Sequence, residues 1–161
     1  MHALPILKAD ALSFSYSPPP APLLFDQLSI HLLPGVTFVS GDESSGKTTL
    51  LHLLAGALPL SAPNANLQIN GISLTENRPA YLQQVAWLDP RDTALDNHTA
   101  RQIFKDFPAN HPRFDADALQ AHIEGLSLTP HLDKALYMLS SGTRRKVLMA
   151  AVLASGAAVS L

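Results

Sequence analysis

The sequence runs Gly41-Asp42-Glu43-Ser44-Ser45-Gly46-Lys47-Thr48 at the point that decides its fold. This stretch fits the pattern G-x-x-x-x-G-K-[ST], which arises by chance about once in 25,000 positions at average residue usage. Glycines let a chain curl tightly enough to aim several backbone N–H groups at one anion. We expect the Lys47 ammonium to reach phosphate oxygens and the Thr48 hydroxyl to ligate Mg²⁺. The stretch therefore predicts a loop that binds the phosphates of a nucleotide.

The residues on either side of this loop supply the structural context that the motif requires. Val36–Val39 form a short apolar, β-branched run of the kind found in buried strands. Thr49–Ala55 follow as a helical run, which Gly56 can close. Because the helix begins at the loop, its positive N-terminal end faces the anion. Strand, loop and helix together predict a phosphate-loop core.

Further strands are expected before and after this core. Alternating apolar residues predict strands at Leu12–Tyr16 and Leu28–Leu32. Leu67–Leu74 has the pattern of a hairpin that turns at Asn70-Gly71. Val85–Leu88 is typical of a short buried strand. These runs point to a mixed sheet in an α/β fold.

The second half of the chain has the pattern of helices. We expect a helical layer without strands from Thr99 to Met138, including a helix that Asp115 caps. A second helical pattern covers Thr143–Ala154, and Gly156 can end it. Ala158–Leu161 then begins what we interpret as one more strand.

Composition limits the classes of protein to consider. The 161 residues carry a formal net charge of -2, 47% of them are hydrophobic and none is cysteine. This charge argues against a nucleic-acid binder with a broad basic face, and the lack of cysteine removes disulfides and thiolate metal sites. The most apolar stretches, Leu50–Leu60 and Val147–Leu161, are shorter than the roughly 20 residues that cross a bilayer. We expect no membrane-spanning segment, and the histidines lack the spacing of a metal site.

Two further segments resemble motifs of the ATP-binding cassette (ABC) transporter ATPases. Leu139–Thr143 read Leu-Ser-Ser-Gly-Thr and resemble the family signature Leu-Ser-Gly-Gly-Gln, which also begins a helix after a helical insert. Tyr16 is similar to the aromatic residue that stacks on adenine in the family. The resemblance spans nearly the whole chain. It implies a P-loop NTPase core of the ABC ATPase type, with N-terminal antiparallel strands and an inserted helical subdomain.

The resemblance also implies a domain plan and a set of site residues. Residues 1–161 would form a single nucleotide-binding domain, with 1–98 and 139–161 as its core and 99–138 as its helical subdomain. In the family two domains pair head to tail, and ATP lies between the loop of one and the signature of the other. Ser140, Ser141 and Gly142 would therefore contact ATP held by a second, identical or different, domain. The chain's own ATP and Mg²⁺ site would comprise Tyr16, Gly41, Asp42, Glu43, Ser44, Ser45, Gly46, Lys47, Thr48 and Thr49, with Thr48 as the metal ligand.

The sequence departs from the family pattern at three places. Ser141 stands where the family has its second glycine, and Thr143 where it has glutamine; the added Cβ of Ser141 is expected to weaken the closed dimer. Asp89-Pro90 occupies the place of a Pro-Gln pair, so no glutamine is assigned to Mg²⁺. The family's catalytic Asp-Glu pair follows the last apolar run, whereas this sequence stops at Leu161. We therefore expect a C-terminally incomplete domain without an assigned general base, which hydrolyses ATP poorly as it stands.

The resemblance implies the ATP-binding subunit of an ABC transporter, which hydrolyses ATP in the complete protein. It would act on the cytoplasmic face of a membrane and couple ATP-driven dimer closure to substrate movement. Its partners would be a second nucleotide-binding domain and a membrane-spanning subunit, with no nucleic acid. Two alternatives stay open: a non-catalytic or regulatory nucleotide-binding module, which Ser141 and Asp89-Pro90 would suit, and a soluble ABC ATPase outside transport. The transported substrate and the direction of transport are not encoded in these residues.

Overall fold

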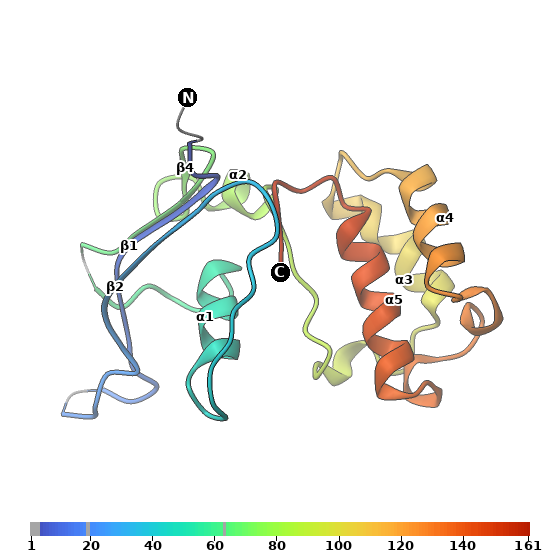
Figure 1. Cartoon of the computed structure of the whole chain (residues 1–161), viewed down its shortest axis with the longest axis horizontal. Helices are drawn as coiled ribbons and strands as arrows, with labels where there is room; N and C mark the ends of the chain where they lie inside the picture. Colours follow the sequence, from blue (N-terminus) through green and yellow to red (C-terminus); the bar gives the residue numbers. More distant parts are fainter. Residues whose placement is uncertain (1–3, 19, 63) are drawn as a thin grey trace. The chain divides into compact units, whose positions relative to one another are not determined.

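The computed structural model describes residues 4–18, 20–62 and 64–161. It divides into two compact units, Met1–Val85 and Ala86–Leu161 (Figure 1). Within the described residues the first unit holds an antiparallel sheet with α1 and α2, and the second is largely helical.

A four-stranded antiparallel sheet organises the first unit, in the order β2-β1-β3-β4. Its strands are β1 (Leu7–Phe14), β2 (Phe25–Leu32), β3 (Asn66–Ile69) and β4 (Ile72–Ser73). Leu7 of β1 pairs with Leu32 on one side and with Ile69 on the other. Asn70 and Gly71 adopt φ values of 51° and 77°, which make the tight turn between β3 and β4. The predicted second strand and the hairpin are confirmed. The first predicted strand, Leu12–Tyr16, is confirmed only in part, because β1 begins at Leu7 and ends at Phe14.

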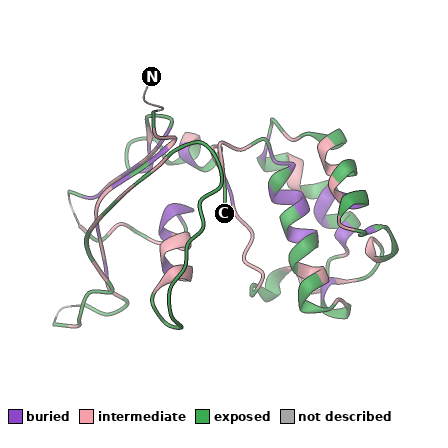
Figure 2. Ribbon diagram, viewed as in Figure 1, coloured by how far each residue is buried: buried purple, intermediate pink, exposed green. Residues whose placement is uncertain are grey.

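Two helices of the first unit, α1 (Lys47–Leu54) and α2 (Arg78–Leu82), complete its core. Gly56 follows α1 with a φ of 70°, so the predicted end of this helix is confirmed. Figure 2 shows buried residues on the strands and on α1. The side chains that are almost wholly buried in this unit include Leu7, Ala9, Leu12, Leu53, Leu67, Ile69 and Tyr81.

The apolar run Val36–Val39 does not form the strand that its pattern predicts. Among the described residues it lies outside both sheets, and Val36 and Phe38 are 102% and 87% exposed. A strand of a parallel sheet needs a neighbour to pair its backbone N–H and C=O groups. No strand in the described ranges pairs with this run, so its β-forming residues remain exposed and without regular secondary structure.

The second unit consists mainly of three α-helices and short 3-10 helices. The α-helices are α3 (Ala100–Asp106), α4 (Ala116–Gly125) and α5 (Ser141–Leu153). The 3-10 helices are η1 (Thr93–Leu95), η2 (Phe107–Asn110), η3 (Thr129–His131) and η4 (Leu136–Met138). Asp115 caps α4 as predicted, because its carboxylate accepts a hydrogen bond from Ala118 N at 2.9 Å.

The helices of the second unit share one apolar core. Its buried members come from α3, α4, α5 and the turns between them, and are Ala100, Ile103, Phe104, Ile123, Leu128, Leu136, Val147, Leu148, Ala150 and Ala151. Residues 99–138 contain helices and turns, with an isolated β-bridge between Thr99 and Ala135. The role of this stretch as an inserted subdomain stays a prediction.

A short pair of strands, β5 (Val85–Ala86) and β6 (Val159–Ser160), forms a second sheet. Leu161 N donates a hydrogen bond to Ala86 O at 3.0 Å. The last predicted strand is confirmed, whereas β5 is shorter than the predicted run Val85–Leu88. In the described part of the chain, every helix is too short or too polar to cross a membrane.

Candidate functional site

The glycine-rich loop of residues 41–46 leads directly into α1, and its residues 41–45 are exposed. Gly46 caps the helix in a left-handed conformation, with φ 89° and ψ 8°. A Cβ at Gly46 would lie 2.9 Å from Phe25 Cζ, so packing as well as conformation requires glycine here. Ser44 is also left-handed, with a φ of 62°. Left-handed residues alternating with right-handed or extended ones turn successive backbone N–H groups toward one side, as in anion-binding loops.

The Lys47 side chain folds back over this loop. Its Nζ donates to Gly41 O at 2.8 Å and to Asp42 O at 2.6 Å. A third contact, to Ser45 Oγ, is longer at 3.3 Å. An ammonium has three donors, and a phosphate oxygen can replace the weakest contact while the two carbonyl bonds keep Lys47 in place. The lysine ammonium is thus held beside the loop by two backbone carbonyls.

The first turn of α1 has the properties of an anion site. No side chain caps this end of α1, and its first turn carries no acidic residue. The first N–H groups of a helix lack intrahelical partners and carry partial positive charge. Thr48 lies in the same turn, half-buried, and its hydroxyl oxygen is a ligand that Mg²⁺ accepts. That hydroxyl together with phosphate oxygens would make an all-oxygen ligand set, which fits Mg²⁺. Among the described residues, no group of three histidine or carboxylate side chains is placed to hold a metal ion.

Two side chains of α2 anchor the other end of α1. Tyr81 Oη donates to Leu54 O at 2.6 Å, and Arg78 Nη2 donates to Gly56 O at 2.7 Å. Burial raises the pKa of the Tyr81 phenol, so its hydroxyl keeps the proton that it donates. These bonds satisfy carbonyls that the end of a helix leaves without partners.

The contacts of Arg78 and Tyr81 with α1 were not predicted from the sequence. The available signal was Asn77 before Arg78-Pro79, because Asn is a favoured N-cap and Pro is favoured in a first turn. The structure uses both, since Asn77 Oδ1 accepts from Ala80 N at 3.2 Å. That signal predicts a helix but not the contacts to α1.

Tyr16 lies just beyond β1 and reaches α1. Its hydroxyl is 2.7 Å from Thr49 Oγ1, and its ring meets Phe14 edge-on with centroids 4.9 Å apart. Thr49 is buried, whereas Tyr16 is 70% exposed. The structure therefore brings the predicted adenine-stacking residue to the helix that follows the loop, with much of its ring open to solvent.

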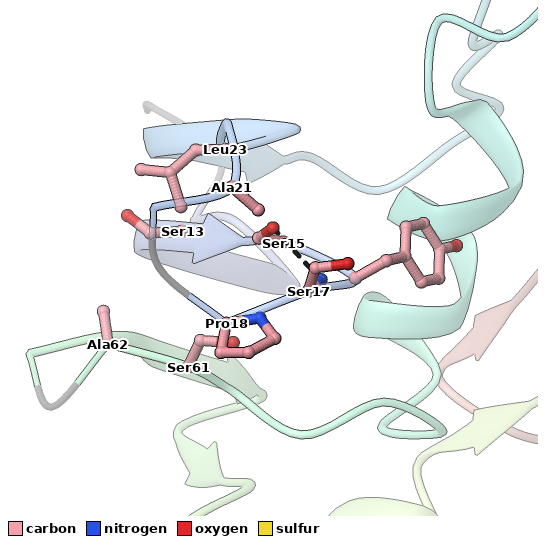
Figure 3. A pocket seen from close by; sticks show the side chains of 9 residues that line it. Ser13, Ser15, Ser17, Pro18, Ala21, Leu23, Ser61 and Ala62 are labelled. Atoms are coloured by element: carbon pink, nitrogen blue, oxygen red, sulfur yellow. Dashed lines mark hydrogen bonds between the residues drawn. The ribbon is translucent and has the colours of Figure 1, made fainter.

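A pocket of about 410 Å³ adjoins Tyr16 (Figure 3). It is lined by Ser13, Ser15, Tyr16, Ser17, Pro18, Ala21, Leu23, Ser61 and Ala62. Ser15 Oγ accepts from Ser17 N at 3.3 Å and donates to Pro22 O at 3.1 Å. The Ser15 hydroxyl thus bonds within the rim of the pocket, whereas the rest of the lining combines apolar side chains with two further serines, Ser13 and Ser61.

The signature-like residues form the start of α5 in the second unit. Ser140 Oγ accepts from Thr143 N at 3.1 Å and lies 2.9 Å from Thr143 Oγ1. Ser140, Ser141 and Gly142 are all exposed. A Cβ at Gly142 would meet only Ser140 Oγ, at 4.0 Å, so packing inside this chain does not require a glycine. The expected effect of Ser141 on a closed dimer stays a prediction.

Comparison with known proteins agrees with the motifs and the fold. The family model described as "ABC transporter" matches residues 25–161. The chain is 33% identical over 129 residues to the cytochrome c biogenesis ATP-binding export protein CcmA of Pseudomonas putida KT2440. The aligned region covers 80% of this chain and 60% of that protein. The chain thus spans about 60% of the length of the curated relatives that it matches first.

Two solved structures share the fold. One is described as the structure of the ATP binding subunit of an ABC transporter. It has a TM-score of 0.74 at 17% identity, and the aligned region covers 96% of this chain and 64% of that protein's chain. The other is cbiO1 from Clostridium perfringens, part of the ABC transporter complex cbiONQ. It has a TM-score of 0.69 at 22% identity, and the aligned region covers 98% of this chain and 64% of the cbiO1 chain. The predicted α/β class with N-terminal antiparallel strands is confirmed.

Proposed function

Because the chain belongs to the ABC transporter family, we propose that it binds ATP as the nucleotide-binding subunit of a transporter. The observation that carries this proposal is the first turn of α1. An uncapped helix end, left-handed Gly46 and Lys47 held on two loop carbonyls all occur at one place. Their combined charge and donor geometry favour a polyphosphate over a neutral ligand.

Each residue of the loop has a definite task in this proposal. Backbone N–H groups of Gly41–Thr49 bind phosphate oxygens, and Lys47 neutralises charge on the outer phosphates. Thr48 holds Mg²⁺ through its hydroxyl, and the Tyr16 ring stacks on adenine while its own hydroxyl stays on Thr49. Bound ATP supplies the phosphoanhydride bond whose cleavage drives the transport cycle.

The start of α5 binds ATP held by a second nucleotide-binding domain. When Thr143 donates through both N–H and Oγ1–H, the two lone pairs of Ser140 Oγ are used and its own proton is free to point outward. A hydroxyl in that state donates to a phosphate oxygen. Tyr137 and Met138, just before this turn, are 66% and 60% exposed, and burial of such side chains favours association.

The second domain and a membrane-spanning subunit are the proposed partners, at the cytoplasmic face of a membrane. ATP closes the pair of domains, and hydrolysis followed by release reopens them, so that chemical energy becomes substrate movement. For a polypeptide of residues 1–161 we propose ATP binding with little turnover, since no carboxylate in it is assigned to activate water.

Calorimetric titration with Mg-ATP tests the proposed site. We expect Lys47→Ala to weaken binding at least about tenfold, because a charge-assisted contact to phosphate contributes more than 1.4 kcal/mol. Lys105→Ala is the matched control, since it removes an exposed lysine of α3 and should leave the affinity unchanged. Equal affinity of Lys47→Ala and the parent chain would place the site elsewhere. Phosphate release measured on the same samples tests the turnover.

A further inference from the structure

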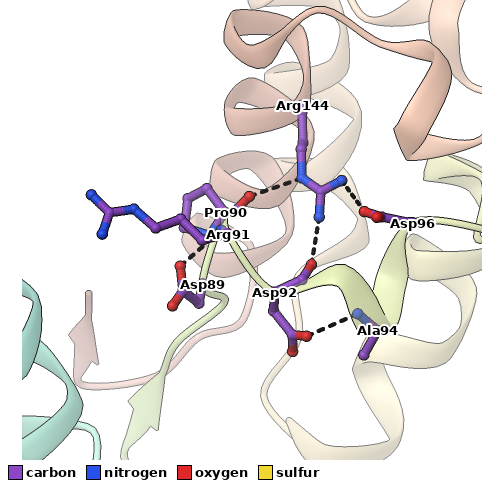
Figure 4. A network of polar contacts seen from close by, with 7 residues as sticks. All are labelled: Asp89, Pro90, Arg91, Asp92, Ala94, Asp96 and Arg144. Carbon is purple, nitrogen blue, oxygen red and sulfur yellow. Dashed lines mark hydrogen bonds and ion pairs between the residues drawn. The ribbon is translucent and has the colours of Figure 1, made fainter.

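Arg144, in the first turns of α5, binds a segment that is distant in sequence (Figure 4). Its Nε donates to Pro90 O at 2.9 Å, and its Nη2 donates to Asp92 O at 2.5 Å. Its Nη1 pairs with the Asp96 carboxylate. The two side chains are only 14% and 30% exposed, so solvent screens this pair less than a surface ion pair. One guanidinium therefore holds the segment Asp89–Asp96 at three points.

The segment is shaped to present these acceptors. Asp89 Oδ1 accepts from Arg91 N at 2.8 Å, and Asp92 Oδ1 accepts from Ala94 N at 2.8 Å. Both carboxylates thus stabilise local turns. Figure 4 shows the Pro90 and Asp92 carbonyls and the Asp96 carboxylate reaching the same guanidinium. A lysine could not reproduce this arrangement, because it lacks the planar fork of donors.

Contacts from the same segment reach both sides of the signature-like residues. Asp96 pairs with Arg144, just after Thr143, through its carboxylate. The backbone oxygen of Asp96 accepts from Tyr137 N at 3.1 Å, just before Leu139. Asp96 therefore contacts residues on either side of the turn that presents Ser140.

The backbone of Arg144 also takes part in that turn. Arg144 N donates to Ser140 O at 2.8 Å, next to the cap bond from Thr143 N to Ser140 Oγ. A cation this close to the positive end of a helix is disfavoured unless an acceptor compensates it. The carboxylate and carbonyls of residues 90–96 supply that compensation.

We propose that Arg144 is a positioning residue that couples the segment Asp89–Asp96 to the first turn of α5, so that the conformation of the segment sets how Ser140 and Gly142 meet nucleotide. The coupling of the segment to α5 is a property of this chain alone, whereas its effect on the contact with nucleotide rests on the proposed function. A change in the conformation of the segment then alters the affinity of the signature turn for ATP bound across an interface.

Amide hydrogen exchange of the Thr143 N–H tests the coupling, because this N–H reports the Ser140 cap. Asp92→Ala loosens the segment without touching the Arg144 side chain, and it should speed exchange at Thr143 about fivefold. Arg144→Gln should speed it about tenfold. Since both act through one link, the double variant should exchange no faster than Arg144→Gln alone.

Arg101→Gln is the matched control for these variants. It breaks an arginine–aspartate pair of the same unit, in which Arg101 Nε lies 2.7 Å from Asp133 Oδ1, yet both side chains are exposed. We expect no change at Thr143. The coupling is overturned if Asp92→Ala leaves Thr143 unchanged, if the two effects add, or if amides throughout α4 and α5 accelerate equally, which would mean general destabilisation.

Sedimentation with Mg-ATP tests the functional consequence. Arg144→Gln should weaken ATP-dependent self-association about tenfold while the calorimetric affinity of the phosphate loop stays unchanged. Equal association of the variant and the parent chain would refute the role of Arg144 and leave the proposed function intact. If the parent chain does not associate with ATP, the proposed contact across domains fails, and hydrogen exchange alone decides the coupling.

Discussion

Replacing Tyr81 by phenylalanine should destabilise the first unit through a single lost hydrogen bond. The Tyr81 side chain is fully buried, and its Oη donates to Leu54 O at 2.6 Å. Tyr81→Phe keeps the ring and its packing but removes that donor from a buried carbonyl. Leaving such a group without a partner costs about 1–3 kcal/mol. For a unit of this size, about 2 kcal/mol corresponds to a decrease in Tm of roughly 8–16 °C.

Urea and thermal denaturation followed by circular dichroism would measure this loss. Tyr137→Phe is the control, because that tyrosine is 66% exposed and its hydroxyl should contribute almost nothing. ATP affinity should change less than about threefold in Tyr81→Phe, since the loop contacts of Lys47 remain. If Tyr81→Phe is as stable as the control within about 0.5 kcal/mol, the stabilising role of the Tyr81 hydroxyl bond to α1 is refuted.

Three further predictions address other sites. Burial lowers the pKa of His111 below its usual 6.5. As the pH decreases, His111 is therefore protonated in the unfolded chain before it is protonated in the folded chain, and the free energy of unfolding should fall from pH 6.5 toward the folded pKa. His111→Phe should reduce this dependence on pH in unfolding measured between pH 7.5 and 5.5. Gly156→Ala should lower the free energy of unfolding by at least about 2 kcal/mol, because φ is 66° and the added Cβ would lie 2.2 Å from Arg113 O. The control Gly125→Ala, whose Cβ would have nothing within 4 Å, should be neutral or slightly stabilising in the same denaturation assay. Tyr16→Ala should weaken ATP binding about tenfold in calorimetry through lost stacking, while Tyr16→Phe keeps the ring and should bind nearly as well; equal binding by both variants would contradict stacking.

Local chemistry explains which features could be predicted. Asp115 as a cap, Asn70-Gly71 as a turn and Gly56 as a helix end all depend on backbone conformations within a few residues, and each is confirmed. Val36–Val39 shows the limit of the same reasoning, because strand formation depends on a pairing partner that a local pattern does not contain.

The amino-acid sequence by itself was enough to recognise the family of this protein and to predict its phosphate loop. The functional groups of each motif, at residues 41–48 and at Leu139–Thr143, stand in consecutive positions, so each motif can be recognised from the sequence alone. The tertiary structure alone decided which side chains hold these motifs in place. Tyr81 reaches Leu54 and Arg144 reaches Asp96 across long stretches of chain. Such contacts follow from packing between elements, which no periodicity or spacing in one segment encodes.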